Sequence, residues 1–271
     1  MQTVAEPMIR QILREFTVLF DRYYMLTALL IAQNSVARQY RDSFLGTVWM
    51  LIVPLMQVLV YAIIMPMIMH QRVDSYVLYL VTMFPLWAFL SSSLINSTKS
   101  LVMQGETLKR CTVSKTVFPL ADVMRHFYTY LISYSVMIFV AMLLTWKWNP
   151  YVLLMPVYLI PAFISIAALA IGISFVTPYM RDITECIVVS MSVLFWLTPV
   201  VYPIDVVPEH LRGWYYLNPM FILMRPAYSL SYKGEIPGLF DTSLLLLLTG
   251  LCVAAGYMVY RLCRRNFVYY L

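Results

Sequence analysis

Six long runs without a charged residue alternate with short charged connections along this chain. The runs cover residues 47–69, 75–98, 127–146, 148–180, 186–204 and 242–260. Crossing a hydrocarbon core of about 30 Å takes roughly 20 helical residues, which each run can supply. A backbone exposed to lipid must satisfy its own hydrogen bonds, so we expect helices. The pattern therefore predicts an all-α membrane protein with six transmembrane helices per subunit.

Two other stretches predict helices that do not span. Residues 8–24 carry apolar side chains on one helical face and charged ones on the other, and an apolar run that ends at Gln33 and Asn34 follows. We expect an N-terminal interfacial amphipathic helix here. The alternative is a poorly marked extra span, which would put the C-terminus outside. Before the last run, five prolines and the uncharged patch 213–224 predict short re-entrant helices.

The 19 lysines and arginines are distributed unevenly over the connections. If the N-terminus is inside, the outer connections hold only Arg72, Lys147, Arg212, Arg225 and Lys233. Basic residues concentrate on the cytoplasmic side of membrane proteins. We therefore expect a multi-pass protein of the cytoplasmic (inner) membrane with both termini in the cytoplasm. The net charge of +6 then needs no nucleic acid to explain it.

Composition leaves room for one domain. The chain has 271 residues, of which 62% are hydrophobic and 12% charged, and its mean hydropathy is +0.76. Soluble domains carry about 25% charged residues. We expect a single transmembrane domain over residues 1–271, with an interfacial helix and inner-mouth loop in 1–46 and a six-span bundle in 47–261. It also has an outer re-entrant segment in 203–240 and a cytoplasmic tail in 262–271.

The sequence lacks the motifs of an internal energy source. It has no GxxxxGK[ST] loop to hold ATP phosphates and no HExxH, and its three histidines are scattered, so we expect no metal site. Carboxylates at membrane depth, which ion-driven pumps use, are also missing. Asp122, Arg125 and His126 are interpreted as an anchor at the inner interface with a local ion pair. Such a protein conducts passively or takes energy from a partner.

Several short motifs are spread over the chain. The first is Arg38-Gln39-Tyr40-Arg41-Asp42-Ser43-Phe44-Leu45-Gly46-Thr47-Val48-Trp49, followed by Pro54 and Tyr61. The others are Leu108-Lys109-Arg110 with Phe118-Pro119, Arg181-Asp182-Ile183, Phe195-Trp196-Leu197-Thr198-Pro199 with Tyr202-Pro203, and Leu217-Asn218-Pro219. Together these motifs resemble those of the ABC-2-type permeases that export polysaccharides. One departure is Leu120, which stands where many relatives have a basic residue.

The resemblance implies a homodimer that docks on two copies of a nucleotide-binding ATPase subunit. ATP and Mg would be bound by that partner, and this chain would hold no cofactor and have no catalytic residue. The implied cargo is a polysaccharide linked to a polyprenyl diphosphate lipid. The first motif is most similar to O-antigen exporters, and capsular polysaccharide and teichoic acid exporters are the alternatives.

The implied path assigns roles to three groups of residues. Sugars stack on aromatic rings, so the candidate pore lining is Trp49, Tyr61, Phe195, Trp196 and Tyr202. Trp49 and Tyr202 fit an aromatic belt at the membrane interfaces equally well. At the cargo entry, Leu45 and Gly46 form a turn, and Arg38 and Arg41 either attract the diphosphate or anchor the inner side. The candidate contacts to the ATPase are Glu106, Lys109, Arg110, Arg10 and Arg14.

Other function classes fit less well. A membrane enzyme acting on a polyprenyl-linked substrate needs convergent carboxylates or a histidine near one interface, which the pattern does not provide. A passive channel needs a ring of charges or a filter motif. A drug exporter of the same superfamily is the main alternative, since it would share the spans and differ in its cargo.

Overall fold

The computed structural model describes residues 22–41, 43–69, 75–105, 114–146 and 149–264, and in these ranges it contains helices and no strand. The α-helices are α2 (Arg22–Gln39), α3 (Trp49–Met69), α4 (Tyr76–Met103), α6 (Val117–Thr145), α7 (Met155–Val176), α8 (Ile183–Leu197), α9 (Glu209–Leu217), α10 (Pro219–Ala227) and α11 (Leu239–Cys263). Short 3-10 turns precede α3, α7 and α9, and a π-helix, η4 (Tyr228–Lys233), follows α10.

Within the described residues, five helical segments are long and apolar enough to cross a membrane: Gly46–Met69, Tyr76–Met103, Val117–Leu143, Pro150–Val176 and Leu239–Cys263. They correspond to five of the six runs expected from the sequence. The remaining run, 186–204, forms the shorter apolar helix α8, which has 15 residues. The all-α membrane fold is confirmed in this form.

Helix α8 ends early because a proline follows its last turn. Thr198 has φ −111° and ψ 137°, an extended conformation. Proline disfavours the helical conformation in the residue before it, and Thr198 precedes Pro199. The uncharged run continues to residue 204, so the length of the run overestimates the length of the helix.

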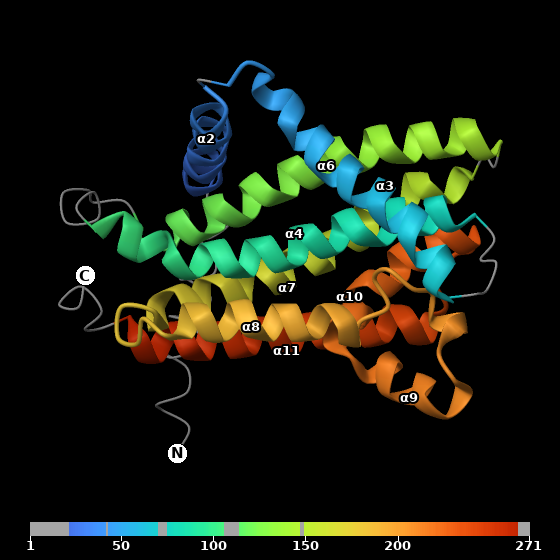
Figure 1. Cartoon of the computed structure of the whole chain (residues 1–271). Coiled ribbons are helices and arrows are strands. Elements are labelled where there is room, and N and C mark those ends of the chain that lie inside the picture. Colours follow the sequence, from blue (N-terminus) through green and yellow to red (C-terminus); the bar gives the residue numbers. More distant parts are fainter. Residues whose placement is uncertain (1–21, 42, 70–74, 106–113, 147–148, 265–271) are drawn as a thin grey trace.

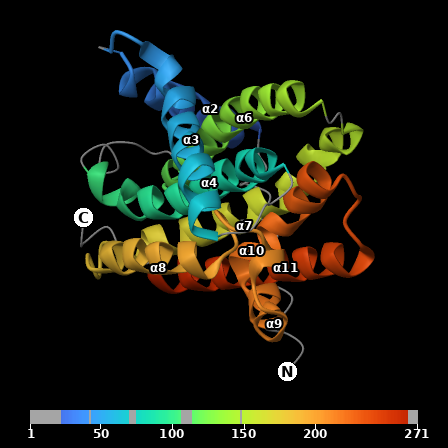
Figure 2. The same cartoon turned by 45° about the vertical axis from the view of Figure 1, so that its right-hand side comes forward.

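The long helices run side by side, and the chain reverses direction at two ends of the bundle (Figure 1). The last turn of α4, the first turns of α6 and α8 and the last turn of α11 lie at one end, and we call it the basic end because it carries Lys99, Lys115, Arg181, Arg261 and Arg264. The other end carries α9 and α10. Figure 2 shows α9 projecting from the bundle there.

Helix α4 is the centre of the bundle. In its most apolar window 78% of the residues are buried, against 11% for the segment of α3 and 22% for that of α11. Helices α3, α6, α7 and α8 all pack against it. Helix α3 is therefore an outer helix, and most of its surface is open in a single subunit.

Small residues let α7 and α11 approach closely. A Cβ atom on Gly256 of α11 would lie 2.2 Å from the carbonyl oxygen of Ala168, and one on Gly172 of α7 would lie 2.9 Å from the carbonyl oxygen of Gly256. Ser165 donates a hydrogen bond to Thr249 across the same interface. Membrane helices associate through such small residues because lipid provides no hydrophobic driving force.

Tyrosine hydroxyls hold the non-helical segment that follows α8. Tyr76 of α4 donates to the carbonyl of Val201, and Tyr79 donates to those of Pro199 and Tyr202. Asn218 donates to the carbonyl of Leu197 at 3.0 Å. These bonds satisfy backbone groups that the helix break leaves unpaired, which a membrane protein must do internally.

Helix α2 lies across the basic end and contacts α6. Its buried face repeats every four residues: Tyr24, Ala28, Ala32 and Val36. Tyr24 donates to Thr116 at 2.8 Å, and burial raises the pKa of its hydroxyl, which keeps the donor protonated. The helix continues through Gln33 and Asn34, where the sequence suggested an end. Most of the amphipathic helix expected at 8–24 lies outside the described residues.

Short helices were expected before the last span, and α9 and α10 are such helices. Helix α10 is buried against α4, α7 and α11, whereas α9 exposes Trp214 and Leu217. At the basic end, residues 99–103 form the last turn of α4, and residues 106–113 lie outside the described residues.

The contact between α7 and α11 predicts that Gly256→Ala destabilises the protein. The added methyl group meets backbone atoms of Ala168, which cannot rotate away, so we expect a loss of roughly 1–3 kcal/mol. Thermal unfolding of the purified protein measures the change. Gly250→Ala in the same helix is the control, since a Cβ there meets nothing within 4 Å. Equal melting temperatures for the two variants would contradict the prediction.

Candidate functional site

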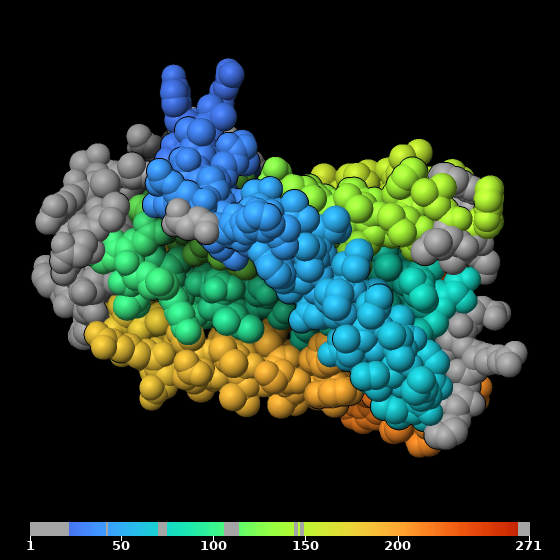
Figure 3. Space-filling view, turned by 45° about the horizontal axis from the view of Figure 1, so that its top comes forward, coloured from blue at the N-terminus to red at the C-terminus, as the bar shows by residue number. Residues whose placement is uncertain are grey.

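A cleft of about 770 Å³ lies between α3, α4, α6 and α8. It reaches from Gln39 and Tyr40 at the basic end to Phe84 and Trp196 further along the bundle. In Figure 3, α3 crosses this face diagonally, with α6 on one side and α8 on the other. Among the described residues that line the cleft there is no Asp, Glu, Lys or Arg.

Aromatic rings form the part of the cleft far from the basic end. The ring of Tyr61 in α3 lies 5.4 Å from that of Phe84 and 6.2 Å from that of Phe195, measured between centroids. Trp87 lies 5.8 Å from Phe195, which contacts Trp196 at 5.3 Å. The rings come from α3, α4 and α8, so their contacts join three helices at one place.

Polar side chains from α4 and α6 line the middle of the cleft. Ser133 of α6 donates to the carbonyl of Met50 at 2.8 Å, and Thr129 donates to its own helix at the Arg125 carbonyl. Ser91 of α4 likewise donates to the Trp87 carbonyl. Each of these hydroxyls donates its proton to a backbone carbonyl, and its oxygen lone pairs remain free to accept a hydrogen bond. The middle of the cleft is therefore uncharged but able to bind hydrogen-bond donors.

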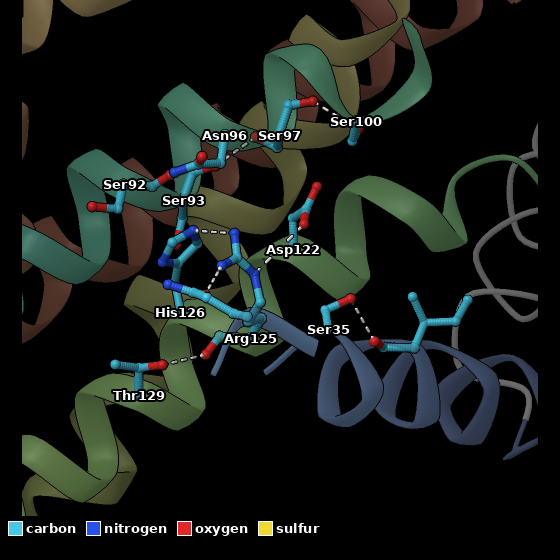
Figure 4. Close-up of polar contacts among 12 residues, drawn as sticks. Ser35, Ser92, Ser93, Asn96, Ser97, Ser100, Asp122, Arg125, His126 and Thr129 are labelled. Carbon is cyan, nitrogen blue, oxygen red and sulfur yellow. Dashed lines mark hydrogen bonds and ion pairs between the residues drawn. The ribbon is translucent and has the colours of Figure 1, made fainter. Parts of the chain in front are cut away.

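We call the end of the cleft that is lined by Gln39, Tyr40 and His126 its mouth, and Arg125 contacts two of these side chains. Its Nη1 donates to Oε1 of Gln39 at 3.0 Å, and its Nη2 lies 3.0 Å from Nε2 of His126. Its Nε lies 3.8 Å from the Asp122 carboxylate, which is longer than a hydrogen bond. Figure 4 shows Arg125 between Asp122 and the His126 ring. Gln39 and His126 line the cleft, so a cation stands directly behind its mouth.

The structure brings four of the five predicted aromatic residues together in this cleft: Trp49, Tyr61, Phe195 and Trp196. Trp49 donates from Nε1 to Ser43 at 3.0 Å near the mouth. Tyr202 lies outside the lining. The helix break after α8 redirects the chain, and the Tyr202 hydroxyl bonds back to the Trp196 carbonyl.

The residues expected at the cargo entry flank the mouth. Gly46 has φ +52°, a left-handed conformation that favours glycine, and begins the 3-10 turn before α3, with Leu45 as its cap. Arg38 is exposed and donates to the Asn34 carbonyl of its own helix, and Arg41 is exposed in the following turn. Neither arginine lines the cleft, whereas Gln39 and Tyr40 between them do.

The expected ATPase contacts, Glu106, Lys109, Arg110, Arg10 and Arg14, lie outside the described residues. Within the described part of the chain, no group of three His, Cys, Asp or Glu residues could hold a metal ion.

Sequence reasoning missed the polar side of the cleft. His126, Thr129, Tyr130 and Ser133 follow one another at spacings of three, one and three residues, which places them on one face of α6. That polar stripe in an otherwise apolar span is a signal the sequence contained. The contact of Arg125 with Gln39, 86 residues away in the chain, left no local signal.

Residues 27–231 match the ABC-2 type transporter family, and this stretch includes every described residue that lines the cleft. The chain belongs to this family. As an ABC-2 permease it lacks an ATPase site, and the nucleotide is bound by a partner ATPase of the ABC type. The resemblance found in the sequence is confirmed at this level.

Curated relatives cover nearly the whole permease. The O-antigen export system permease protein RfbA of Klebsiella pneumoniae is 26% identical over 243 residues, which is 85% of this chain and 92% of the relative. The protein of the same name from Myxococcus xanthus is 24% identical over 222 residues, or 79% of this chain and 84% of the relative.

The cleft predicts which positions in α4 water can reach. In a permease whose four cysteines are replaced by alanine, we expect Ser92→Cys, in the lining, to react with a water-soluble thiol reagent roughly tenfold faster than Ser97→Cys. Ser97 is fully buried and is the control. The labelling rates in membranes measure the difference, and a protected Ser92→Cys would mean that the cleft is closed to water.

Proposed function

We propose that this permease is the transmembrane subunit of an ATP-driven exporter of a lipid-linked polysaccharide, with O-antigen as the cargo. The lining of the cleft is the observation that carries the proposal. Four aromatic side chains predicted to contact sugars, namely Trp49, Tyr61, Phe195 and Trp196, line it together with serine, threonine and glutamine side chains, and the described part of the lining contains no Asp, Glu, Lys or Arg.

This lining suits the chemistry of a glycan. Sugar rings have apolar C–H faces that pack on aromatic rings, as apolar groups generally do, and hydroxyl groups that need polar partners. The acceptor lone pairs of Ser91, Thr129 and Ser133 can supply those partners. The names of the curated relatives support O-antigen over the capsular polysaccharide, teichoic acid and drug alternatives.

The orientation follows from the charges. Basic residues concentrate on the cytoplasmic side, so the basic end and both chain termini face the cytoplasm in the inner membrane. The cleft then has its mouth, at Gln39 and Tyr40, on the side where a lipid-linked glycan is made. Trp49 and Tyr61 lie along the wall of the path that leads outward.

A second copy completes the path. In a single subunit the outer face of α3 is open, with Met56, Ile63 and Met67 more than half exposed. Two-fold dimers are the commonest soluble assemblies, and two subunits facing each other across α3 would enclose the open side of the cleft. Each subunit would dock on one ATPase, through the segment that holds Glu106, Lys109 and Arg110.

Deletion of the permease tests the proposal. We expect lipid-linked glycan to accumulate in the cytoplasm and surface glycan to be lost, because the polymer is made but not exported. Extraction of lipid-linked polymer and surface staining measure both effects, and a plasmid copy of the gene should restore export. Unchanged surface glycan with increased sensitivity to drugs would favour the drug-efflux alternative.

Arg41→Ala tests the cargo-entry role. The residue is exposed in the turn next to the mouth, and we expect loss of its charge to reduce surface glycan several-fold while the protein remains in the membrane. Quantitative surface staining, normalised to the amount of permease in the membrane, measures the change. Arg22→Ala, at the opposite end of α2, is the matched control. Normal surface glycan in the Arg41 variant would remove the diphosphate role of this residue.

A further inference from the structure

We propose that the mouth of the cleft is a binding site for a phosphoryl oxyanion, made by Gln39, Tyr40 and His126 and oriented by Arg125. The proposal rests on the proposed function, since it names the part of the cargo that this site would hold. It differs from the expectation drawn from the sequence, in which Arg38 and Arg41 either attract the diphosphate or anchor the inner side.

Arg125 fixes which way its neighbours point. A guanidinium group has five N–H donors and no acceptor. The Nε2 atom of His126, 3.0 Å from Nη2, must therefore accept, so the neutral ring carries its proton on Nδ1. In the same way, the bond from Nη1 turns Oε1 of Gln39 toward the arginine and leaves the Nε2 amide of Gln39 to donate elsewhere.

The donated bonds continue outward from the cation. Nε2 of Gln39 donates to the Tyr40 hydroxyl at 3.3 Å, so the Tyr40 proton remains as a donor at the end of the chain of bonds. Consecutive hydrogen bonds of one direction polarise one another. Each of the three side chains lines the cleft, and each presents an N–H or O–H donor that Arg125 has not used.

An uncharged cargo would not need this arrangement. A charged side chain inside a membrane span is expensive and commonly marks a functional site. Asp122 pairs with Arg125 at Nε, at 3.8 Å and on the side away from His126 (Figure 4), which leaves the two Nη atoms to Gln39 and His126. Hydrogen-bond donors that lie next to a cation, as those of Gln39 and His126 lie next to Arg125, bind phosphate oxygens well, because these oxygens are strong acceptors. Two sources could supply them here: the diphosphate of a lipid-linked glycan and the headgroup of a bilayer phospholipid.

Equilibrium binding to the full permease tests the site. The protein is purified into discs of zwitterionic lipid and titrated with a radiolabelled polyprenyl diphosphate that carries no sugar. The matching polyprenol, inorganic diphosphate and phosphatidylglycerol serve as competitors. We expect strong binding of the labelled lipid, weak competition by the polyprenol, and at least about tenfold weaker binding by Arg125→Gln. Arg125→Lys keeps the charge but cannot hold Gln39 and His126 together, so we expect an intermediate loss.

Tyr40→Phe removes one hydroxyl and leaves the shape of the side chain, so it carries the test if Arg125→Gln fails to fold. We expect it to weaken binding several-fold. Tyr128→Phe on α6 and Lys99→Gln on α4 are the matched controls, since both residues are exposed and neither lines the cleft. Wild-type affinity in both Arg125→Gln and Tyr40→Phe, or equal losses in the controls, would overturn the proposal.

The competitors separate the two sources, and the deletion separates this inference from the proposed function. Equal competition by phosphatidylglycerol would uphold the oxyanion site and assign it to bilayer lipid. If the deletion strain accumulates lipid-linked glycan but Arg125→Gln binds normally, the function stands and the site is wrong. If diphosphate binding depends on Arg125 but the deletion strain exports glycan normally, the site stands and the glycan cargo is wrong.

Discussion

Every backbone polar group of this protein that lies in lipid must find a partner within the chain, and the fold follows from that requirement. Continuous helices meet it without help, which is why long uncharged stretches become α3, α4, α6, α7 and α11. The interruption after α8 is possible because Tyr76 and Tyr79 project from the central helix and bind the freed carbonyls. The break after α8 therefore depends on the central position of α4, because tyrosines on α4 bind the carbonyls that the break leaves unpaired.

The same requirement shapes the cleft. A water-filled path through a membrane domain needs polar groups, but unpaired charges in it would be costly. The hydroxyls of Ser91, Thr129 and Ser133 meet this need by donating to nearby carbonyls, so each is paired and still offers an acceptor. Among the described residues no Asp, Glu, Lys or Arg enters the lining, and Arg125 stands behind the mouth in contact with Gln39 and His126.

Charge pattern was sufficient to predict the helical spans because a charged residue in lipid is penalised wherever it occurs along the chain. It was not sufficient to predict where α8 ends, because Thr198 and Pro199 are uncharged. The helix ends there because proline disfavours the helical conformation in the residue before it. The same backbone break affects the site. Tyr202, for which pore lining and an interfacial belt fitted the sequence equally well, follows the turn at Pro199 and lies outside the lining, whereas Trp49, Tyr61, Phe195 and Trp196 all line the cleft. The mouth depends on a contact between Gln39 and Arg125, and distant pairings of this kind have no signature in local spacing.

The 15 residues of α8 measure about 22 Å, which is less than the hydrocarbon thickness of about 30 Å. A bilayer adjusts to such a mismatch by thinning beside the short helix. Because α8 forms one wall of the cleft, the thinned lipid lies next to the cleft. Any polar molecule that moved along this wall would have a shorter apolar barrier to pass than beside the longer spans, and the membrane itself would then take part in lowering the cost of transport.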